Sequence, residues 1–421
     1  MRSFLKTKTA IALALSMTAG TASADGHSGV EVLHWWTSGG EAAALNVLKE
    51  DLSGQGVGWT DMPIAGGGGS DAMTVLRARV TAGDPPTAVQ MLGFAIQDWA
   101  GEGALADLNA LAAEQNWDEV VPAALQGFSK FEGNWVAAPV NVHSTNWVWA
   151  NSAIMAELGL TEAPADWDSF VAAMQAAQDA GYVGLAHGGQ AWQDATVFDS
   201  IAMGVGGPEF YQAAFIDLDA DALGGAQMIE AFHRMETLRG FVDDNFSGRD
   251  WNLASAMVAN EEALFQIMGD WAKGEFINAG QTAGVEFQCF RVPGSEGTVT
   301  FNSDQFAMFE VTDAAAMDAQ MTMASSVMSP EFQVAFNTVK GSVPARTDIS
   351  DAEFDACGQL GMAQLADAAA NGGLFGSMAH GHANNPSVQN AMYDVITAHF
   401  NGEYDAETAA AELVTAVELA Q

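Results

Sequence analysis

The chain has 421 residues, with 53 acidic and 14 basic side chains and a formal net charge of −39. A surface of this charge repels nucleic acid and anionic lipid, so we expect neither as a partner. The length is too great for one ordinary hydrophobic core and predicts two lobes. A hydrophobic content of 49% is enough to build them.

The first residues are typical of a secretory signal peptide. Three basic residues fall within the first eight positions, an apolar run covers 9–18, and Ala22-Ser23-Ala24 fits a cleavage site. We therefore expect residues 1–24 to be removed and the mature protein to be soluble in the periplasm. After this loss 11 basic residues oppose 53 acidic ones, for a net charge of −42. No later apolar run reaches membrane-spanning length.

The sequence contains two cysteines, Cys289 and Cys357. In an exported protein an even pair most often forms a disulfide, and two buried free thiols are the alternative. A metal site would need more ligands than these two residues offer. We expect neither a metal nor a cofactor.

The first part of the chain alternates strand and helix patterns. Runs of apolar, β-branched and aromatic residues predict strands, and apolar residues at helical spacing predict helices. We expect strands at 30–35, 57–64 and 87–92, a helix at 41–52, and a second helix that is capped by Ser70 or Asp71 and ends at Val80. This alternation indicates a parallel α/β sheet.

The pattern returns in the rest of the chain, without a linker that would separate two independent domains. We expect strands with a crossing point within 135–151, a helix at 164–180, a helix leading into a strand over 257–268, a strand at 301–310, a helix at 314–328, and mostly helix after 351. Two α/β lobes connected by several crossings fit this order best.

The stretch VLHWWTSGGE, residues 32–41, places two adjacent indoles where a strand meets a helix. Open α/β sheets bind ligands at the carboxyl ends of their strands, and the helix start adds free backbone N–H groups there. Indole faces pack against the C–H faces of a sugar ring, and a carboxylate such as Glu41 accepts hydrogen bonds from hydroxyls. Either ring alone could be core, but strand alternation argues against both Trp35 and Trp36 being core.

Further polar and aromatic clusters with glycine fall at the ends of predicted elements. Each alone is also typical of an ordinary capped loop, but together they offer the donors, acceptors and rings that a hydroxyl-rich ligand requires. The clusters are 141–144, 187–193, 269–271, 302–304, 339–342 and 379–382.

Catalysis and metal binding are the competing interpretations. Glu41 and Asp304 could be the two carboxylates of a glycosidase, and His187, His380 and His382 could bind zinc. The histidines lack a further spaced cluster, no Gly-x-Ser-x-Gly elbow is present, and the glycines at 66–69 lack the ending of a phosphate loop.

Eight ordered segments resemble the extracellular sugar-binding proteins of ABC transporters (extracellular solute-binding protein family 1), and more closely their periplasmic glucose/mannose-binding branch. The resemblance covers nearly the whole mature chain, and the two cysteines also match the pattern of that branch. The segments are VLHWWTSGGE, GDPPTA, APVNVHSTNWVWAN, LAHGGQAWQ, IMGDWAKGEF, FNSDQF, NTVKGSVPAR and SMAHGHA.

The resemblance implies a two-lobed α/β periplasmic-binding-protein fold of type II. Each lobe would be a mostly parallel sheet flanked by helices, and a hinge of several crossings would join residues 25–140 plus 303–345 to residues 141–302 plus 346–421. The ligand would lie between the lobes. The implied binding residues are Trp35 and Trp36 for stacking and packing, Glu41 for hydroxyl contacts, Trp271 as the opposing ring, and Asn302, Asp304, Lys340 and His380.

Leu92 departs from the pattern, because glucose binders of this branch typically carry a lysine at that position. Leucine cannot donate to a hydroxyl, and a pocket without the donor rejects ligands that need it. A sugar with a less polar group at that edge, or a glycoside, would suit Leu92.

We therefore expect a monomeric receptor that captures a sugar such as glucose or mannose, or a related glycoside, and delivers it to the permease of an ABC importer. The alternative is a secreted glycoside hydrolase that uses Glu41 and Asp304.

Overall fold

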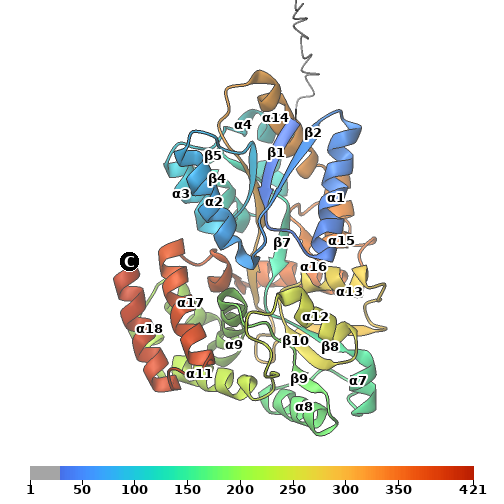
Figure 1. Cartoon of the computed structure of the whole chain (residues 1–421), viewed down its shortest axis with the longest axis vertical. Coiled ribbons are helices and arrows are strands. Elements are labelled where there is room, and N and C mark those ends of the chain that lie inside the picture. The colour runs from blue at the N-terminus through green and yellow to red at the C-terminus, as the bar shows by residue number, and fades with distance from the viewer. Residues whose placement is uncertain (1–28) are drawn as a thin grey trace, which may run out of the picture.

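The computed structural model describes residues 29–421, so the predicted signal peptide at 1–24 lies outside the described residues. Two lobes lie one above the other in Figure 1, with strand β7 between them. Within residues 29–421, no helix is both long and apolar enough to cross a lipid bilayer.

The upper lobe in Figure 1 is built on a five-stranded sheet with the order β2-β1-β3-β13-β6. The pairs β1–β2 and β1–β3 are parallel, while β13 runs antiparallel to β3 and β6. The strands are β1 (Gly29–His34), β2 (Gly58–Pro63), β3 (Ala88–Leu92), β6 (Ala137–Pro139) and β13 (Asp304–Met308), and a small hairpin consists of β4 (Lys130–Phe131) and β5 (Asn134–Trp135). The helices are α1 (Gly39–Gly54), η1 (Gly67–Gly69), α2 (Ser70–Thr81), α3 (Gly93–Gly101), α4 (Asn109–Glu114), α5 (Trp117–Val120), α6 (Ala123–Ser129), α14 (Ala314–Val327) and α15 (Pro330–Lys340).

The lower lobe has a four-stranded sheet with the order β11-β8-β10-β9. Only β10–β9 is parallel, so the expectation of a mostly parallel sheet is wrong for this lobe. The strands are β8 (Trp147–Asn151), β9 (Val183–Leu185), β10 (Ala263–Ile267) and β11 (Phe287–Arg291). The helices are α7 (Ser152–Glu157), α8 (Trp167–Asp179), α9 (Ala191–Tyr211), η2 (Gln212–Ile216), α10 (Ala220–Leu223), α11 (Ala226–Arg239), α12 (Trp251–Ala259), α13 (Ala272–Asn278), α17 (Pro386–Phe400) and α18 (Ala406–Ala420).

A third sheet, with the order β14-β7-β12-β15, lies between the two lobes. Its strands β7 (Asn141–Ser144) and β12 (Val299–Asn302) are each one residue away in the chain from an upper-lobe strand, β6 and β13. The remaining elements here are β14 (Val343–Pro344), α16 (Ala356–Asn371), β15 (Leu374–Gly376) and η3 (Met378–His380). The lobe boundaries at 140/141, 302/303 and 345/346 stay a prediction, and these strand positions are compatible with it.

Two predicted elements differ in detail. The single strand expected at 301–310 is divided at Ser303 into β12 and β13, which belong to different sheets. The second helix is not capped by Ser70 or Asp71, because its N-cap is Gly69 in the left-handed conformation, with φ +80°, and no side chain caps it.

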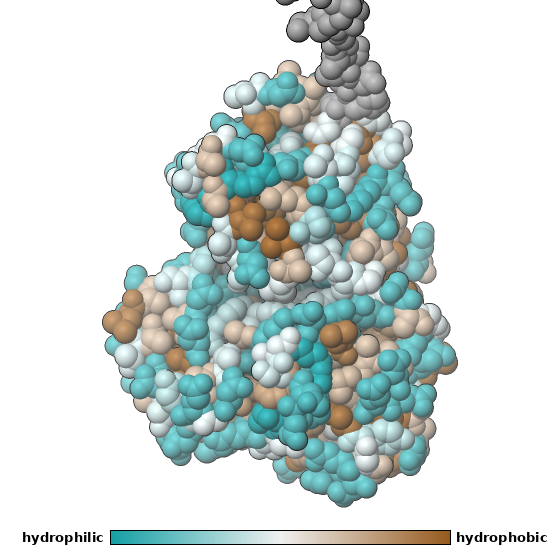
Figure 2. Space-filling view, in the orientation of Figure 1, coloured by the Kyte–Doolittle hydropathy of each residue, from teal (hydrophilic) through white to brown (hydrophobic). Residues whose placement is uncertain are grey.

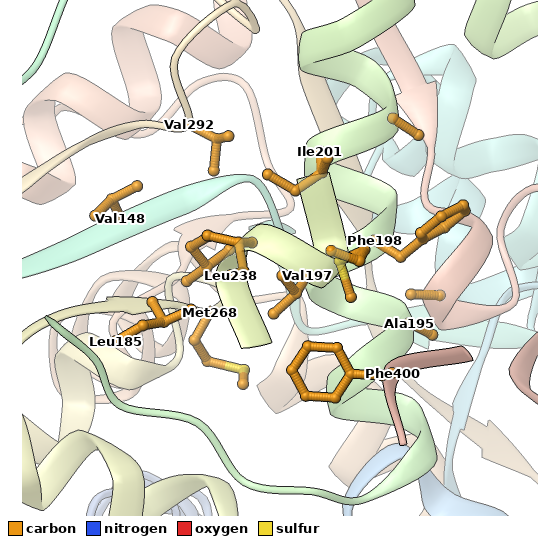
Figure 3. Packing of buried hydrophobic residues seen from close by; sticks show 14 of the residues in the cluster. Val148, Leu185, Ala195, Val197, Phe198, Ile201, Leu238, Met268, Val292 and Phe400 are labelled. Atoms are coloured by element: carbon orange, nitrogen blue, oxygen red, sulfur yellow. The ribbon is translucent and has the colours of Figure 1, made fainter. Parts of the chain in front are cut away.

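The cores explain why these segments form their elements. In the upper lobe, Leu33 and Trp35 pack on one face of the sheet with α2 and α3, whereas Val32 and Trp36 pack on the other with α1 and α15. In the lower lobe, residues 192–203 of helix α9 are buried on all sides. Its buried Asp194 and Asp199 are paired with His187 and Tyr211. Figure 3 shows its side chains packed against strands and helices around it.

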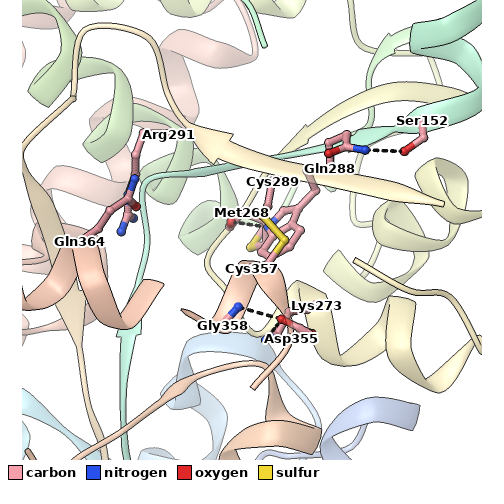
Figure 4. Close-up of a disulfide and its surroundings, with 11 residues drawn as sticks. Ser152, Met268, Lys273, Gln288, Cys289, Arg291, Asp355, Cys357, Gly358 and Gln364 are labelled. Carbon is pink, nitrogen blue, oxygen red and sulfur yellow. Dashed lines mark hydrogen bonds and ion pairs between the residues drawn. A yellow bond between two sulfur atoms is a disulfide. The ribbon is translucent and has the colours of Figure 1, made fainter. Parts of the chain in front are cut away.

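The predicted disulfide is present between Cys289 of β11 and Cys357 of α16, with a Cα–Cα distance of 6.1 Å. Figure 4 shows it beside an ion pair between Lys273 and Asp355, whose Nζ and Oδ1 atoms lie 2.9 Å apart. Lys273 belongs to α13 and Asp355 is the N-cap of α16, so the covalent and ionic links together hold α13, α16 and β11 as one unit.

We predict that this crosslink stabilises the fold by about 4 kcal/mol, the chain-entropy value for a loop of this length. The double variant Cys289→Ser, Cys357→Ser should lose about this much unfolding free energy in urea titrations, and reduced wild-type protein should match it. Unfolded, unreduced wild type should show no reactive thiol. Labelling of two thiols per chain under those conditions would contradict the pairing.

Candidate ligand-binding site

One cavity between the lobes, with a volume of about 150 Å³, is lined by all nine side chains predicted to bind ligand. A cavity of about this volume holds a single six-membered ring such as benzene. The nine are Trp35, Trp36, Glu41, Leu92, Trp271, Asn302, Asp304, Lys340 and His380. The other lining residues are Thr37, Ser38, Ala65, Gly66, Gly67, Gly68, His143, Trp192, Asp250, Trp251 and Asn252.

The turn between β1 and α1 is held by a capping box. The Glu41 backbone N–H donates to Ser38 Oγ at 3.3 Å, and Glu41 Oε2 accepts from the backbone N–H groups of Thr37 (3.1 Å) and Ser38 (3.2 Å). This pattern satisfies donors that the first turn of a helix otherwise leaves unpaired. One oxygen of Glu41 therefore serves the helix, and only Oε1 remains for other contacts.

Trp35 and Trp36 follow β1 and are both largely buried, with exposed fractions of 8% and 2%. Each packs in a different core cluster, and each also lines the cavity. The argument from strand alternation against both rings being core is thus wrong. The strand ends at His34, and the sheet has a core on both of its faces.

Glu275 reaches from α13 of the lower lobe to this same turn in the upper lobe. Its Oε1 accepts hydrogen bonds from Ser38 Oγ at 2.6 Å and from the Gly40 backbone N–H at 2.8 Å. A carboxylate at a helix N-terminus is favourable because the free N–H groups carry partial positive charge. The approach is close: a Cβ atom at Gly40 would lie 2.7 Å from the carbonyl carbon of Gly274. The structure is therefore closed across the cleft.

Asp304 is the centre of a buried hydrogen-bond chain. Its Oδ1 accepts from Gln90 Nε2 at 2.8 Å, and its Oδ2 accepts from Asn141 Nδ2 at 2.9 Å and lies 3.0 Å from His143 Nε2. Burial alone would raise the pKa of Asp304, but His143, Lys340 and Asn141 hold that pKa well below its usual range. Gln90 also accepts from the Trp35 backbone N–H at 3.0 Å, which fixes the start of the Trp-Trp turn.

His143 continues the chain into the lower lobe, because its Nδ1 bonds Asp270. Burial would lower the pKa of His143, but the carboxylates of Asp270 and Asp304 raise it above its ordinary value. An imidazolium between two carboxylates is thus the favoured state. Asp304 lies on β13, His143 on β7 and Asp270 just after β10, so this charge triad extends from one lobe through the hinge to the other.

Aromatic rings from the lower lobe form the wall opposite Trp35 and Trp36. The ring centroids of Trp271 and His380 lie 5.1 Å apart, those of Trp271 and His143 lie 5.2 Å apart, and those of Trp271 and Trp192 lie 6.4 Å apart. Trp192, at the start of α9, contacts the upper lobe closely, since a Cβ atom at Gly67 would lie 2.3 Å from its ring. Trp271 is therefore the central ring of this wall.

Lys340 and Asn302 supply polar groups. Lys340, the last residue of α15, places Nζ 3.6 Å from Glu41 Oε1 and 5.7 Å from the centroid of the Trp36 ring. Burial raises the pKa of Glu41, and Lys340 and Ser38 oppose this shift. The Oδ1 atom of Asn302 is buried and has no hydrogen-bond partner among the described residues. Because an unpaired buried acceptor is costly, Asn302 fits a ligand hydroxyl that would donate to it.

His380 and His382 are kept neutral. Burial lowers the pKa of His380 to about 3 and that of His382 to about 4. His380 Nε2 lies 3.1 Å from Thr196 Oγ1, and His382 Nδ1 lies 2.8 Å from the His380 carbonyl oxygen. Neutral His380 can therefore offer the cavity an aromatic edge without a charge.

These contacts bear on the competing interpretations. Both carboxylate oxygens of Asp304 already accept hydrogen bonds, and Glu41 Oε2 accepts from the backbone N–H groups of the α1 turn. His187 bonds Asp194 at 2.7 Å rather than joining His380 and His382. Within residues 29–421, no group of three or more histidine, cysteine, aspartate or glutamate side chains is arranged to hold a metal ion. The arrangement suits reversible binding of a ring with hydroxyl groups.

The sequence reasoning did not select several important residues. His143 and Trp192 lay inside two of the polar clusters, but Glu275, Gln90 and Asp250 were not singled out. The spacing Ser38-x-x-Glu41 is itself a capping-box signature and could have indicated the structural role of Glu41. Gln90 lies in no quoted segment, and Glu275 lies in IMGDWAKGEF without a distinguishing feature, because only the folded chain brings the two residues to the site.

Two lobes that close on a polar, aromatic cavity at their hinge define a solute receptor. Residues 35–319 match the model of a family described as bacterial extracellular solute-binding protein. The chain belongs to this family, whose members bind solutes and are not enzymes.

Named relatives cover nearly the whole chain. A "Probable sugar-binding periplasmic protein" of Rhizobium meliloti (strain 1021) is 61% identical over 421 residues, 100% of both chains. A protein of the same name from Brucella suis biovar 1 (strain 1330) is 57% identical over 413 residues, 98% of this chain and 97% of the relative.

Solved structures share the fold. The bacterial solute receptor AcbH, described as having an exclusive preference for b-D-galactopyranose, has a TM-score of 0.79 at 16% identity, covering 94% of this chain and 99% of the receptor. A chitin oligosaccharide binding protein has a TM-score of 0.79 at 19% identity, covering 93% and 98%. The predicted type II two-lobed fold is thus confirmed.

We predict that His380 and His382 lower the unfolding free energy between pH 7 and pH 5, whereas His143, whose pKa is raised, and Asp199, whose pKa burial raises to about 6, act in the opposite direction. The pKa values of His380 and His382 in the folded protein, about 3 and about 4, lie below the ordinary 6.5, so only the unfolded chain binds these protons as the pH falls. Each histidine should remove about 2 kcal/mol at pH 5 relative to pH 7. Urea unfolding at both pH values measures the change.

The variant His380→Gln should lose about half of this histidine contribution, so its pH dependence should be shallower than that of wild type. His233→Gln is the control, because the side chain of His233 is 46% exposed and its pKa is raised rather than lowered. Equal pH dependence in His380→Gln and wild type would contradict the buried neutral state.

Proposed function

We propose that this chain is the periplasmic receptor of an ABC importer and captures a sugar between its lobes for delivery to the membrane permease. The cavity of about 150 Å³ carries the proposal: indole rings enclose it from both lobes, and the buried Asn302, Asp304 and Lys340 offer an acceptor, a carboxylate and an ammonium group. Flat C–H faces of a sugar ring fit the rings, and its hydroxyls fit the polar groups. The names of the relatives support this choice.

The nine predicted side chains would have different roles in binding. Trp271 would stack on one face of the sugar, with Trp35 and Trp36 on the opposite side. Asn302, Asp304 and Lys340 would bind hydroxyls, and His380 would pack edge-on against the ring. Glu41 would act mainly on the α1 turn, with Oε1 directed toward Lys340.

Binding would shift an open state toward the closed state seen here. The closed state is stabilised by the Glu275 contacts to Ser38 and Gly40, which an open state would replace with water. We also propose that the receptor acts as a monomer. Calorimetric titration with a panel of monosaccharides tests the proposal, and product analysis after long incubation separates binding from hydrolysis. Native mass spectrometry of the protein as purified would identify a retained ligand.

We predict that Trp271→Ala weakens binding of the matching sugar by more than ~1 kcal/mol, the lower range for a buried aromatic anchor. The change removes the central ring of the lower-lobe wall. Calorimetry measures the affinity, and Trp167→Ala is the control because Trp167 lies on α8 of the same lobe and does not line the cavity. Unchanged affinity in Trp271→Ala would exclude this ring from the site.

We predict that Glu275→Ala weakens binding by about 1.5–3 kcal/mol, the range for hydrogen bonds to a charged group, because only the closed state makes these contacts. The loss should appear mainly as faster ligand dissociation in stopped-flow tryptophan fluorescence. Glu412→Ala, an exposed change on α18, should leave affinity and rates unchanged. If Glu275→Ala dissociates ligand at the wild-type rate, Glu275 is not part of the closed state that holds it.

A further inference from the structure

A second, larger hollow adjoins the cavity on the side of Leu92. Its volume is about 760 Å³, and it shares Trp35, Gly68, Leu92 and His380 with the first cavity. Leu92 ends β3 directly opposite Asp304 of β13, so its side chain lies at the boundary between the two spaces. We call the first space the inner cavity and the second the outer hollow.

The outer hollow belongs to the cleft because both lobes line it. The upper lobe contributes residues of α2 and α3, such as Met73 and Ala95, and the lower lobe contributes Gln389 and Asn390 of α17. The lobes meet beside it, where the Phe94 backbone N–H donates to the Gly381 carbonyl oxygen at 2.9 Å. Figure 2 shows that the surface narrows to a recess between the upper and lower lobes. Apolar surface gathers on the upper lobe beside this recess.

The two spaces differ in chemistry. The inner cavity is polar, with the buried Asn302, Asp304 and Lys340. The upper-lobe side of the outer hollow combines the apolar Leu92, Met73 and Ala95 with the charged Arg77 and Asp98. Its lower-lobe side offers the amide of Asn390 and the amide oxygen of Gln389, whose Nε2 already donates to the Ala379 carbonyl oxygen and to Tyr393. A ring with one apolar face and a polar edge fits this combination.

We infer that the ligand is a sugar linked through a glycosidic oxygen to a second ring, with the sugar in the inner cavity and the second ring in the outer hollow. This inference rests on the proposed sugar-binding function and names its substrate class. The inner cavity has room for one ring and the outer hollow for a larger group. This ligand class explains why position 92 is leucine and not a hydrogen-bonding residue. The sugar position that carries the link has no free hydroxyl that needs a partner.

The test compares single sugars with their two-ring derivatives. Glucose, mannose and galactose, their α- and β-phenyl glycosides, and disaccharides that carry the same sugar at either end are titrated into the wild-type protein by calorimetry. At least one two-ring compound should bind ten-fold or more tightly than its parent sugar. A preference for phenyl glycosides would identify an aromatic aglycone as the second ring, and a preference for a disaccharide would identify a second sugar.

Ala95→Trp should remove this advantage, because Ala95 lines the outer hollow and not the inner cavity. The affinity for the parent sugar should stay within two-fold of wild type. Ala78→Trp, at an exposed position of α2 that also lines only the outer hollow, is a second variant in case Ala95→Trp does not fold. Ala113→Trp, exposed on α4 and lining neither space, is the matched control and should keep the advantage.

Wild-type protein that binds a single sugar at least as tightly as every two-ring derivative would overturn the inference and leave the proposed function intact. Retention of the full advantage in both Ala95→Trp and Ala78→Trp would also overturn it, because the second ring would then lie elsewhere. Failure of every sugar and derivative to bind would overturn the proposed function, and this inference with it.

Discussion

A buried carboxylate between two lobes is the constraint on which the rest of this structure depends. Asp304 lies away from bulk water and stays charged because Asn141 and His143 bond to it and Lys340 lies nearby, while Gln90 donates to its other oxygen. Gln90 fixes the Trp35 turn, and His143 leads to Asp270 in the other lobe. One charge thus connects β3, β7 and β13 and fixes the side chains that meet at Asp304. Fixing these side chains within the protein reduces the entropic cost of ordering them when a ligand binds.

The site is built from element ends rather than element interiors. β1, β3 and β12 end at the cavity, and α1 and α9 begin there. Strand ends direct side chains away from the sheet core, and helix starts supply free N–H groups. Because these ends come from both lobes, the cavity exists in full only when the lobes are closed. Under the proposed function, recognition and closure would therefore be the same event.

The sequence allowed the two-lobed fold, most element positions and the disulfide to be predicted, because periodicity, turn residues and cysteine count are local properties. It could not separate β12 from β13, since Ser303 lies within the polar run 302–305 and the chain is extended on both sides of it. The nine proposed binding residues came together only through family resemblance. No local rule places Trp35, Lys340 and His380 in one cavity, and Glu275 and Gln90 depend wholly on tertiary placement. Their binding roles stay predictions.

The link between Cys289 and Cys357 has a consequence for when this protein can work. Asp355, two residues before Cys357, holds Lys273 of α13, and α13 begins directly after Trp271 and carries Glu275. The crosslink therefore supports the Trp271 side of the cavity from behind. In a newly exported chain whose thiols are not yet oxidised, α13 and Trp271 would be held less rigidly. Such a chain would capture ligand fully only after the disulfide has formed. Receptor supply would then depend on the thiol oxidants of the compartment as well as on synthesis and export.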